Sequence, residues 1–361
     1  MYQRKSDGRW CENVNGHVIY GKTQRELKQK LIAYTGKVEN GFTVAEALEA
    51  WVKYKEPDIS YKTYEGYTAP IKRINAVFGE RPAKDIQPSD IQAFINSLAK
   101  QGYKRSTVQR PLNILSMLYD WLITQPGALV KNNPCGAVRL PNGLKQERRE
   151  LAAENDIQRI KDNVCADFGL FAFLLLYTGL RKGEALALRY EDINRESGYI
   201  SVNKSVSWQT NQPVVKEPKT EAGVREVVLL NQLAEVLPKS KRGYIFSPDG
   251  GKSPLTQIEF RHRWDNYCRV AGLCDVSYEQ HTNPSNKHTY TKTVYTSRVT
   301  PHQLRHEFAR LCFDAGLEER DTQNIMGHAN ISTTHAVYDH IRESRRQKSI
   351  SKLQNYVDGA I

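Results

Sequence analysis

The sequence lacks any apolar segment long enough to cross a lipid bilayer. Its longest apolar run, residues 170–177 (LFAFLLLY), falls far short of the ~20 residues that a membrane-spanning helix needs, so we expect it to form a buried helix. The amino terminus is polar and shows no signal-peptide pattern. We therefore expect the protein to stay inside the cell and to have no membrane partner.

Paired cysteines are also missing. The six cysteines include no CxxC pair, which favours free and mostly packed thiols over disulfides or a zinc site. No cluster of carboxylates stands out as a site for two magnesium ions, and there is no glycine-rich phosphate loop. We therefore expect neither a metal nor another cofactor.

Positive charge, by contrast, is in surplus. The chain has 361 residues, a net charge of +12 and a sequence pI near 9.3. This length suits two domains and a small appendage. Such a surplus in a folded protein favours a polyanionic partner, with nucleic acid as the leading candidate, although basic ribosomal and structural proteins share it.

Residues 1–41 predict a small basic β/α module. Two short strand-like stretches, GRWCENV and HVIYG, precede a helix that Thr23 and Glu26 are placed to cap. Its basic side chains include Arg4, Lys5, Lys22 and Arg25. A solvated surface module and an accessory grip on DNA are equally favoured.

Residues 42–133 predict an all-α bundle. Four segments carry apolar residues at helical spacing, beginning at Thr43, Ser60, Ser89 and Ser106. Pro70 is expected to kink or interrupt the second helix. Lys104 and Arg105 lie just before the fourth helix, where free N–H groups favour a phosphate.

The remaining sequence predicts a linker and a second domain. Residues 134–150 combine two prolines, two glycines and a run of charges, as is typical of a linker. Residues 151–361 predict a mixed α+β domain, mainly α, with a strand-rich part near 198–230 and a C-terminal tail. The fold class is therefore multidomain.

Two motifs in this domain each contain a basic side chain that could bind or protonate a substrate. TGLRKGEALAL (178–188) places Arg181 directly after the buried helix, with Glu184 able to orient it toward a phosphate; alone, an ordinary exposed ion pair is the simpler interpretation. KEPKTEAGVREVVLL (216–230) predicts two strands joined by a turn. Lys219, just before that turn, could act as a general acid, with Lys216 as a competitor and a solvated lysine as the simpler interpretation.

Two later motifs add further side chains that could take part in the same chemistry. TPHQLRHEFARLCFDAG (300–316) predicts a helix whose first turn presents His302 and Arg305 to an anion, though an ordinary surface pair is equally favoured. GHANISTTHAVYDH (327–340) contains His328 and places Tyr338 on or beside the buried side of another helix. Metal-free phosphodiester cleavage needs a nucleophile, cations around the phosphate and an acid, which these residues together supply.

In their order and spacing, these motifs resemble the tyrosine recombinase (phage integrase) family. The resemblance covers about residues 42–345, and the motifs that carry it are TGLRKGEAL, the KT…G.R.V.L hairpin, HQLRHEFA, GHANISTT and VYDHI. The helical bundle is similar to the family's core-binding domain, and the basic first module to the arm-type DNA-binding domains of phage and transposon integrases. The resemblance implies a site-specific DNA recombinase of a mobile element, working in the cytoplasm of a bacterial host.

The resemblance also implies a role for each matching residue. Tyr338 would attack the scissile phosphate and form a 3′-phosphotyrosyl link, while Arg181 and Arg305 clamp that phosphate. Lys219 would protonate the leaving oxygen, His302 would assist proton transfer, and His328 would bond the phosphate. Supporting positions would be Glu184 and His306.

Further implications concern partners. The resemblance implies ATP-independent strand exchange by a homotetramer on double-stranded DNA attachment sites, with the tail docked on a neighbouring protomer. It leaves room for an accessory excision factor.

Two features depart from the family's pattern. Glu307 stands where many relatives have a small hydroxyl residue, which would put a negative charge near the cations. Residues 276–299 are longer than the usual connection and predict an inserted β-hairpin. Contact of this hairpin with DNA or a neighbour and a purely solvated hairpin are equally favoured.

Two other functions share part of this pattern. A type IB topoisomerase-like relaxing enzyme would use the same chemistry as a monomer, but the basic first module and the long tail argue against it. A DNA-binding regulator with a silent catalytic centre would have no reason to keep a complete set of chemical residues.

Overall fold

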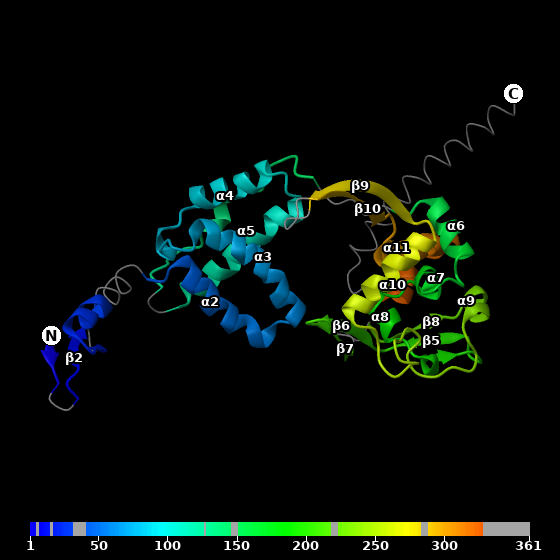
Figure 1. Cartoon of the computed structure of the whole chain (residues 1–361), viewed down its shortest axis with the longest axis horizontal. Coiled ribbons are helices and arrows are strands. Elements are labelled where there is room, and N and C mark those ends of the chain that lie inside the picture. Colours follow the sequence, from blue (N-terminus) through cyan, green and yellow to red (C-terminus); the bar gives the residue numbers. More distant parts are fainter. Residues whose placement is uncertain are drawn as a thin grey trace, which may run out of the picture. The chain divides into compact units, whose positions relative to one another are not determined.

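The structure is a computed structural model that describes residues 1–4, 7–14, 17–31, 41–125, 128–145, 151–217, 223–282 and 288–327 (Figure 1). By its internal contacts the chain divides into two compact units, Met1–Arg148 and Arg149–Ile361. None of the described helices is both long and apolar enough to cross a membrane.

The first residues form a small antiparallel sheet with the order β1-β2-β3, comprising β1 (Tyr2–Gln3), β2 (Trp10–Val14) and β3 (His17–Gly21). The two predicted strands are confirmed, and the structure adds the short first one. A helix follows over residues 24–31, and Thr23 Oγ1 accepts a 3.1 Å hydrogen bond from the Glu26 amide, as expected of a cap. The Glu26 carboxylate accepts from the Lys22 amide at 2.8 Å.

The predicted four-helix bundle is confirmed. Its helices are α2 (Val44–Lys55), α3 (Tyr61–Phe78), α4 (Pro88–Lys100) and α5 (Arg105–Ile123). The first begins at the predicted position, with a capping box in which Thr43 and Glu46 bond each other's main chain. Apolar side chains from all four helices form one buried core, including Trp51, Ile74, Ile95 and Leu115.

Three details of the bundle differ from the predictions. Helix α3 runs without interruption through Pro70, which is buried along with Ile74 and Phe78, so packing of the apolar face outweighs the missing hydrogen bond. Helix α4 begins at Pro88 rather than Ser89, because proline suits the first helical position. Helix α5 already includes Arg105, with Lys104 as its N-cap.

Part of the segment predicted as a linker packs against the bundle. A short 3₁₀ helix, η3 (Pro134–Ala137), buries Cys135 and is followed by the buried Val138. Beyond it, the Gln92 side chain exchanges two 2.9 Å hydrogen bonds with the main chain of Arg139. Residues 134–145 are therefore held by the amino-terminal unit.

The second unit has mixed α+β architecture and is mainly helical, as predicted. Its described helices are α6 (Glu154–Asp162), α7 (Gly169–Thr178), α8 (Lys182–Ala187), α9 (Asn231–Val236), α10 (Gln257–Val270), α11 (Pro301–Asp314) and α12 (Glu319–Met326). Helix α7 is the predicted buried helix, and its side chains from Phe171 to Leu176 lie in the core. The elements around α7 pack against it, because burying its apolar side chains away from water is favourable.

The described strands of this unit form three separate antiparallel sheets. They are β4 (Ile193–Asn194), β5 (Tyr199–Val202), β6 (Ser205–Gln209), β7 (Gln212–Lys216), β8 (Arg225–Val228), β9 (Cys274–Thr282) and β10 (Thr289–Ser297). The sheet orders are β4-β5-β8, β6-β7 and β10-β9. The predicted pairing of the strands on either side of Lys219 is wrong: β7 pairs with β6 across Thr210 and Asn211, both at positive φ, whereas β8 pairs with β5.

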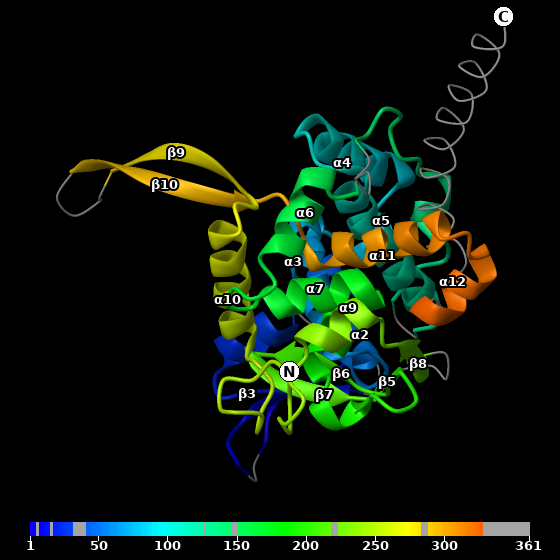
Figure 2. The same ribbon diagram turned by 90° about the vertical axis from the view of Figure 1, so that its right-hand side faces the viewer.

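The predicted hairpin within residues 276–299 is confirmed. Strands β9 and β10 pair from Cys274↔Ser297 to Thr282↔Thr289, and Figure 2 shows them extending away from α10 and the other helices of their unit. Most of their side chains are exposed, including Tyr278 and Tyr290.

An arginine cluster as candidate active site

The site is built around the sharp connection between α7 and α8. Gly179 ends α7 in the left-handed conformation (φ +62°), and a Cβ atom there would lie 2.3 Å from the ring of Phe308 on α11. Arg181 follows as the N-cap residue of α8. Glycine thus allows α7 and α11 to approach closely at the point where the chain turns toward Arg181.

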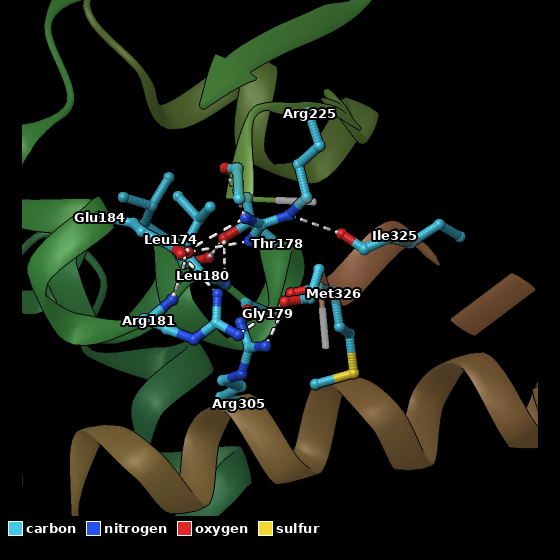
Figure 3. Close-up of polar contacts among 12 residues, drawn as sticks. Leu174, Thr178, Gly179, Leu180, Arg181, Glu184, Arg225, Arg305, Ile325 and Met326 are labelled. Atoms are coloured by element: carbon cyan, nitrogen blue, oxygen red, sulfur yellow. Dashed lines mark hydrogen bonds and ion pairs between the residues drawn. The ribbon is translucent and has the colours of Figure 1, made fainter. Parts of the chain in front are cut away.

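Glu184 orients Arg181, as the sequence predicted (Figure 3). Arg181 Nη1 donates to Glu184 Oε1 at 2.7 Å, and the Arg181 amide donates to Oε2 at 2.9 Å. The side chain of Glu184 is only 6% exposed, whereas that of Arg181 is 43% exposed. The arginine is therefore held from one side and still open to solvent from the other.

Arg225, on β8, completes this centre and was not singled out from the sequence. Its Nη2 lies 2.8 Å from Glu184 Oε2, its Nε donates to the Ile325 carbonyl at 2.9 Å, and its side chain is 7% exposed. The only signal in the sequence was its position in the matched hairpin motif. That motif gave no indication that β8 would lie beside α8.

Arg305, the predicted second arginine, reaches the same place from α11. Its helix begins as predicted, with Thr300 as the N-cap and Pro301 in the first turn. The side chain is almost fully buried and donates to the carbonyl of Gly179 and, at 2.6 Å, to that of Met326. Arg305 therefore links the end of α7 to the end of α12.

The carboxyl end of α12 faces all three arginines. Arg225, Arg305 and Arg181 bind the carbonyls of Ile325, Met326 and Gly327, respectively. These carbonyls lie at the end of a helix, where they have no partner in the helix and where the helix dipole is negative. Helix α12 ends at Gly327, which adopts the left-handed conformation (φ +63°).

The cluster keeps a surplus of positive charge. Burial would raise the pKa of Glu184, but its hydrogen bonds with Arg225 and Arg181 lower it below its ordinary value. Burial lowers the pKa of Arg305 to about 9, and the charges of Arg181 and Arg225 act in the same direction. Among the described residues, three guanidinium groups therefore face one carboxylate at neutral pH, an arrangement that suits an added anion with several oxygens.

Two histidines lie close together on α11, the helix that also carries Arg305. His302 is exposed and His306 is buried, and their ring centroids are 4.4 Å apart at an angle of 72°. The contact follows from their spacing of four residues on one helix face.

Several predicted residues lie outside the described part of the chain: Lys5, Lys219, His328 and Tyr338. Arg4, Lys22 and Arg25 belong to the amino-terminal module, where the guanidinium of Arg4 lies over the ring of Tyr20. The exposed Lys104 and Arg105 start α5, and the Arg105 amide donates to the Lys145 carbonyl at 3.0 Å. That amide is therefore already used within the bundle.

Glu307, expected to put a negative charge near the cations, is paired with an arginine of its own helix. Its buried carboxylate accepts a 2.7 Å hydrogen bond from Arg310, one turn along α11, and burial raises its pKa. Residues 305 and 307 are two positions apart and therefore project from different sides of the helix.

Within the described residues, no group of three His, Cys, Asp or Glu side chains is arranged to hold a metal ion. The ligands that this cluster offers are guanidinium donors. They suit an anion rather than a cation.

Two family models match the sequence. The one described as phage integrase family matches residues 152–345, and the one described as phage integrase, N-terminal SAM-like domain, matches residues 43–99. Among curated relatives, the tyrosine recombinase XerC-like protein of Caldanaerobacter subterraneus is 22% identical, with 94% of this chain and 93% of the relative covered. The ICEBs1 integrase of Bacillus subtilis is 25% identical, with 79% and 75% covered.

Solved structures give the same picture of the fold. The Tn1549 transposon integrase, in complex with transposon right end DNA, has a TM-score of 0.65 at 18% identity, covering 85% of this chain and 99% of that one. A lambda integrase dimer bound to a COC′ core site has a TM-score of 0.59 at 19% identity, covering 93% of each chain. The helical bundle and the mixed α+β unit are thus a shared architecture.

Proposed function

Because the chain belongs to the phage integrase family, we propose that its arginine cluster holds the scissile phosphate of a DNA attachment site during site-specific recombination. The protein is a tyrosine recombinase, whose relatives include integrases of a prophage and of ICEBs1. The observation that carries the proposal is the cluster's charge, with Arg181, Arg225 and Arg305 placed around the single carboxylate of Glu184.

Arg181 and Arg305 are the proposed phosphate clamps. Arg181 is fixed by Glu184 yet open to solvent, so it can meet a ligand without losing its orientation. Arg305 is fixed by the carbonyls of Gly179 and Met326. Donors held in place before the reaction stabilise the charge of the transition state, and each is worth about 100- to 1,000-fold in rate.

Cleavage follows as a transesterification. The phenolic oxygen of Tyr338 attacks phosphorus, the bond from phosphorus to the 5′ oxygen breaks, and a 3′-phosphotyrosyl link remains. The leaving oxygen takes a proton from Lys219, the tyrosine proton passes to a base assisted by His302, and His328 bonds the phosphate. Rejoining reverses these steps with another 5′ hydroxyl, so no ATP is required.

The proposed partners are double-stranded attachment sites and further copies of the chain. Lambda integrase has been solved as a tetramer bound to a Holliday junction, with a fold shared by this chain at a TM-score of 0.55. By analogy, four protomers recombine two duplexes, each docking its C-terminal tail on a neighbour, with an accessory factor favouring excision. Residues 1–41 contact arm-type DNA, and residues 42–133 contact the core site. The reaction takes place in the cytoplasm of a bacterial host.

The proposal is tested with a nicked DNA substrate that carries the attachment site and traps the covalent intermediate. Wild-type protein is expected to form a DNA adduct that protease removes, and Tyr338→Phe is expected to form none while binding the same DNA. Binding should weaken steeply with salt, because lysine and arginine side chains displace counterions from the phosphates.

Two results would contradict it. Absence of any adduct from wild-type protein bound to its site would favour a silent DNA-binding regulator. An adduct that persists in Tyr338→Phe would remove Tyr338 as the nucleophile.

A further inference from the structure

Arg225 shares the carboxylate of Glu184 with Arg181 but is far less exposed. We infer that Arg225 is a positioning residue: it holds Glu184 and the end of α12 in place, and it leaves the charge of Arg181 available for the phosphate. This inference rests on the proposed clamping role of Arg181 and Arg305.

The first argument is that every nitrogen of the Arg225 side chain is used within the protein. Nε donates to the Ile325 carbonyl, Nη2 to Glu184 Oε2 at 2.8 Å, and Nη1 to Glu184 Oε1 at 3.3 Å and to the Gly223 carbonyl at 3.4 Å. An arginine whose three side-chain nitrogens are all engaged in this way is suited to hold other groups rather than to bind substrate.

The second argument concerns the division of charge on Glu184. Each carboxylate oxygen accepts from both arginines: Oε1 from Arg181 Nη1 and Arg225 Nη1, and Oε2 from the Arg181 amide and Arg225 Nη2. Without Arg225, the full negative charge of a buried carboxylate would fall on Arg181 alone. Arg181 would then be held more tightly by the protein and offer less net charge to a phosphate.

The third argument is the register of α12. Arg225, Arg305 and Arg181 bind three consecutive carbonyls, those of Ile325, Met326 and Gly327. Arg225 thereby ties β8 and α8 to the helix end that also supports both proposed clamps. Loss of this tie is expected to shift the clamps, and misplacement by about 1 Å can reduce a reaction rate ~100-fold.

The test compares two nicked substrates that differ only at the scissile linkage, one with the normal phosphodiester and one with an uncharged methylphosphonate. On the phosphodiester, Arg225→Ala is expected to lower the rate of adduct formation at saturating DNA by about 10- to 100-fold. On the methylphosphonate the defect is expected to shrink to within about threefold, because an uncharged group depends less on well-placed cations.

Arg195→Ala is the matched control. Arg195 also donates to carbonyls at a helix end, those of Ala234 and Leu237 at α9, but it lies apart from the cluster contacts. It is expected to react at the wild-type rate on both substrates. Arg225→Lys, which keeps a charge beside Glu184, provides a second variant if Arg225→Ala does not fold, and is expected to show the same substrate-dependent defect in milder form.

The outcomes separate the two levels of the argument. If wild-type protein forms no adduct, the proposed function fails. If wild type forms the adduct but Arg225→Ala and Arg225→Lys react at the wild-type rate, or are equally slow on both substrates, the positioning role is overturned.

Discussion

Arg305 donates a 2.6 Å hydrogen bond to the carbonyl of Met326, the last residue of α12. The chain continues from this point toward His328 and Tyr338 in the sequence. A proposed phosphate clamp is therefore bonded to the helix that precedes the proposed nucleophile. This relationship makes Arg305 the first residue to test.

Arg305→Lys is expected to lower the rate of covalent adduct formation by about 100- to 1,000-fold, because an ammonium group cannot replace the planar fork that bonds two carbonyls and a phosphate. Single-turnover cleavage of the nicked substrate measures the rate. Arg310→Lys, on the same helix but paired with Glu307, is the control and should change the rate by less than about threefold. Similar rates in the two variants would contradict a clamping role.

Glu184→Gln is expected to change the pH dependence of stability. Hydrogen bonds with Arg225 and Arg181 lower the pKa of Glu184 below its ordinary value of 4.5, despite burial, so the ionised carboxylate stabilises the folded state. This contribution is fully present above pH 4.5 and is lost as the pH falls through the folded-state pKa. The difference in melting temperature between wild type and variant should therefore be greatest near pH 6–7 and shrink toward pH 3. A difference that is independent of pH would contradict the assignment.

Much of the fold could be predicted because its signals are local. The helix start at Thr43, the apolar run of α7 and the two strands β9 and β10 each depend on residues within a few positions of the chain. The contact between Arg181 and Glu184 belongs to the same class, since the two residues lie three positions apart at one helix start.

The remainder depended on contacts between distant parts of the chain. Arg225 meets Glu184 across 41 positions, and only because β8 pairs with β5 instead of with β7. No alternation within residues 216–230 could reveal that choice, because a strand's pattern reports its faces and not its partner. For Glu307, the partner Arg310 lies only three positions away and could have been recognised from the sequence.

Tyr119→Phe tests the bundle independently of the candidate site. The Tyr119 hydroxyl donates to the Ala83 carbonyl at 2.9 Å in the buried core, so its removal leaves that carbonyl without this bond and should cost about 1–3 kcal/mol. Calorimetry should show a lower melting temperature for the amino-terminal unit. Tyr103→Phe, at an exposed ring, is the control and should have little effect. Equal melting temperatures for the two variants would show that the bond adds no stability.

Gly179→Ala joins stability and catalysis in one position. A methyl group there would lie 2.3 Å from Phe308 Cδ1, and the left-handed conformation costs a non-glycine residue a further ~1–2 kcal/mol. Because the Gly179 carbonyl accepts from Arg305, the strain should also displace a proposed clamp, so the rate of adduct formation should fall at temperatures where the variant is still folded.

Calorimetry and single-turnover cleavage measure the two effects, with Gly198→Ala as a control: this glycine also has positive φ (+74°), but its Cβ position is open. If both variants lose stability but only Gly179→Ala loses rate, the loss of rate comes from the contact with Arg305 and not from backbone strain alone. If both variants cleave at the same rate, the close approach of α7 to α11 does not support the clamp.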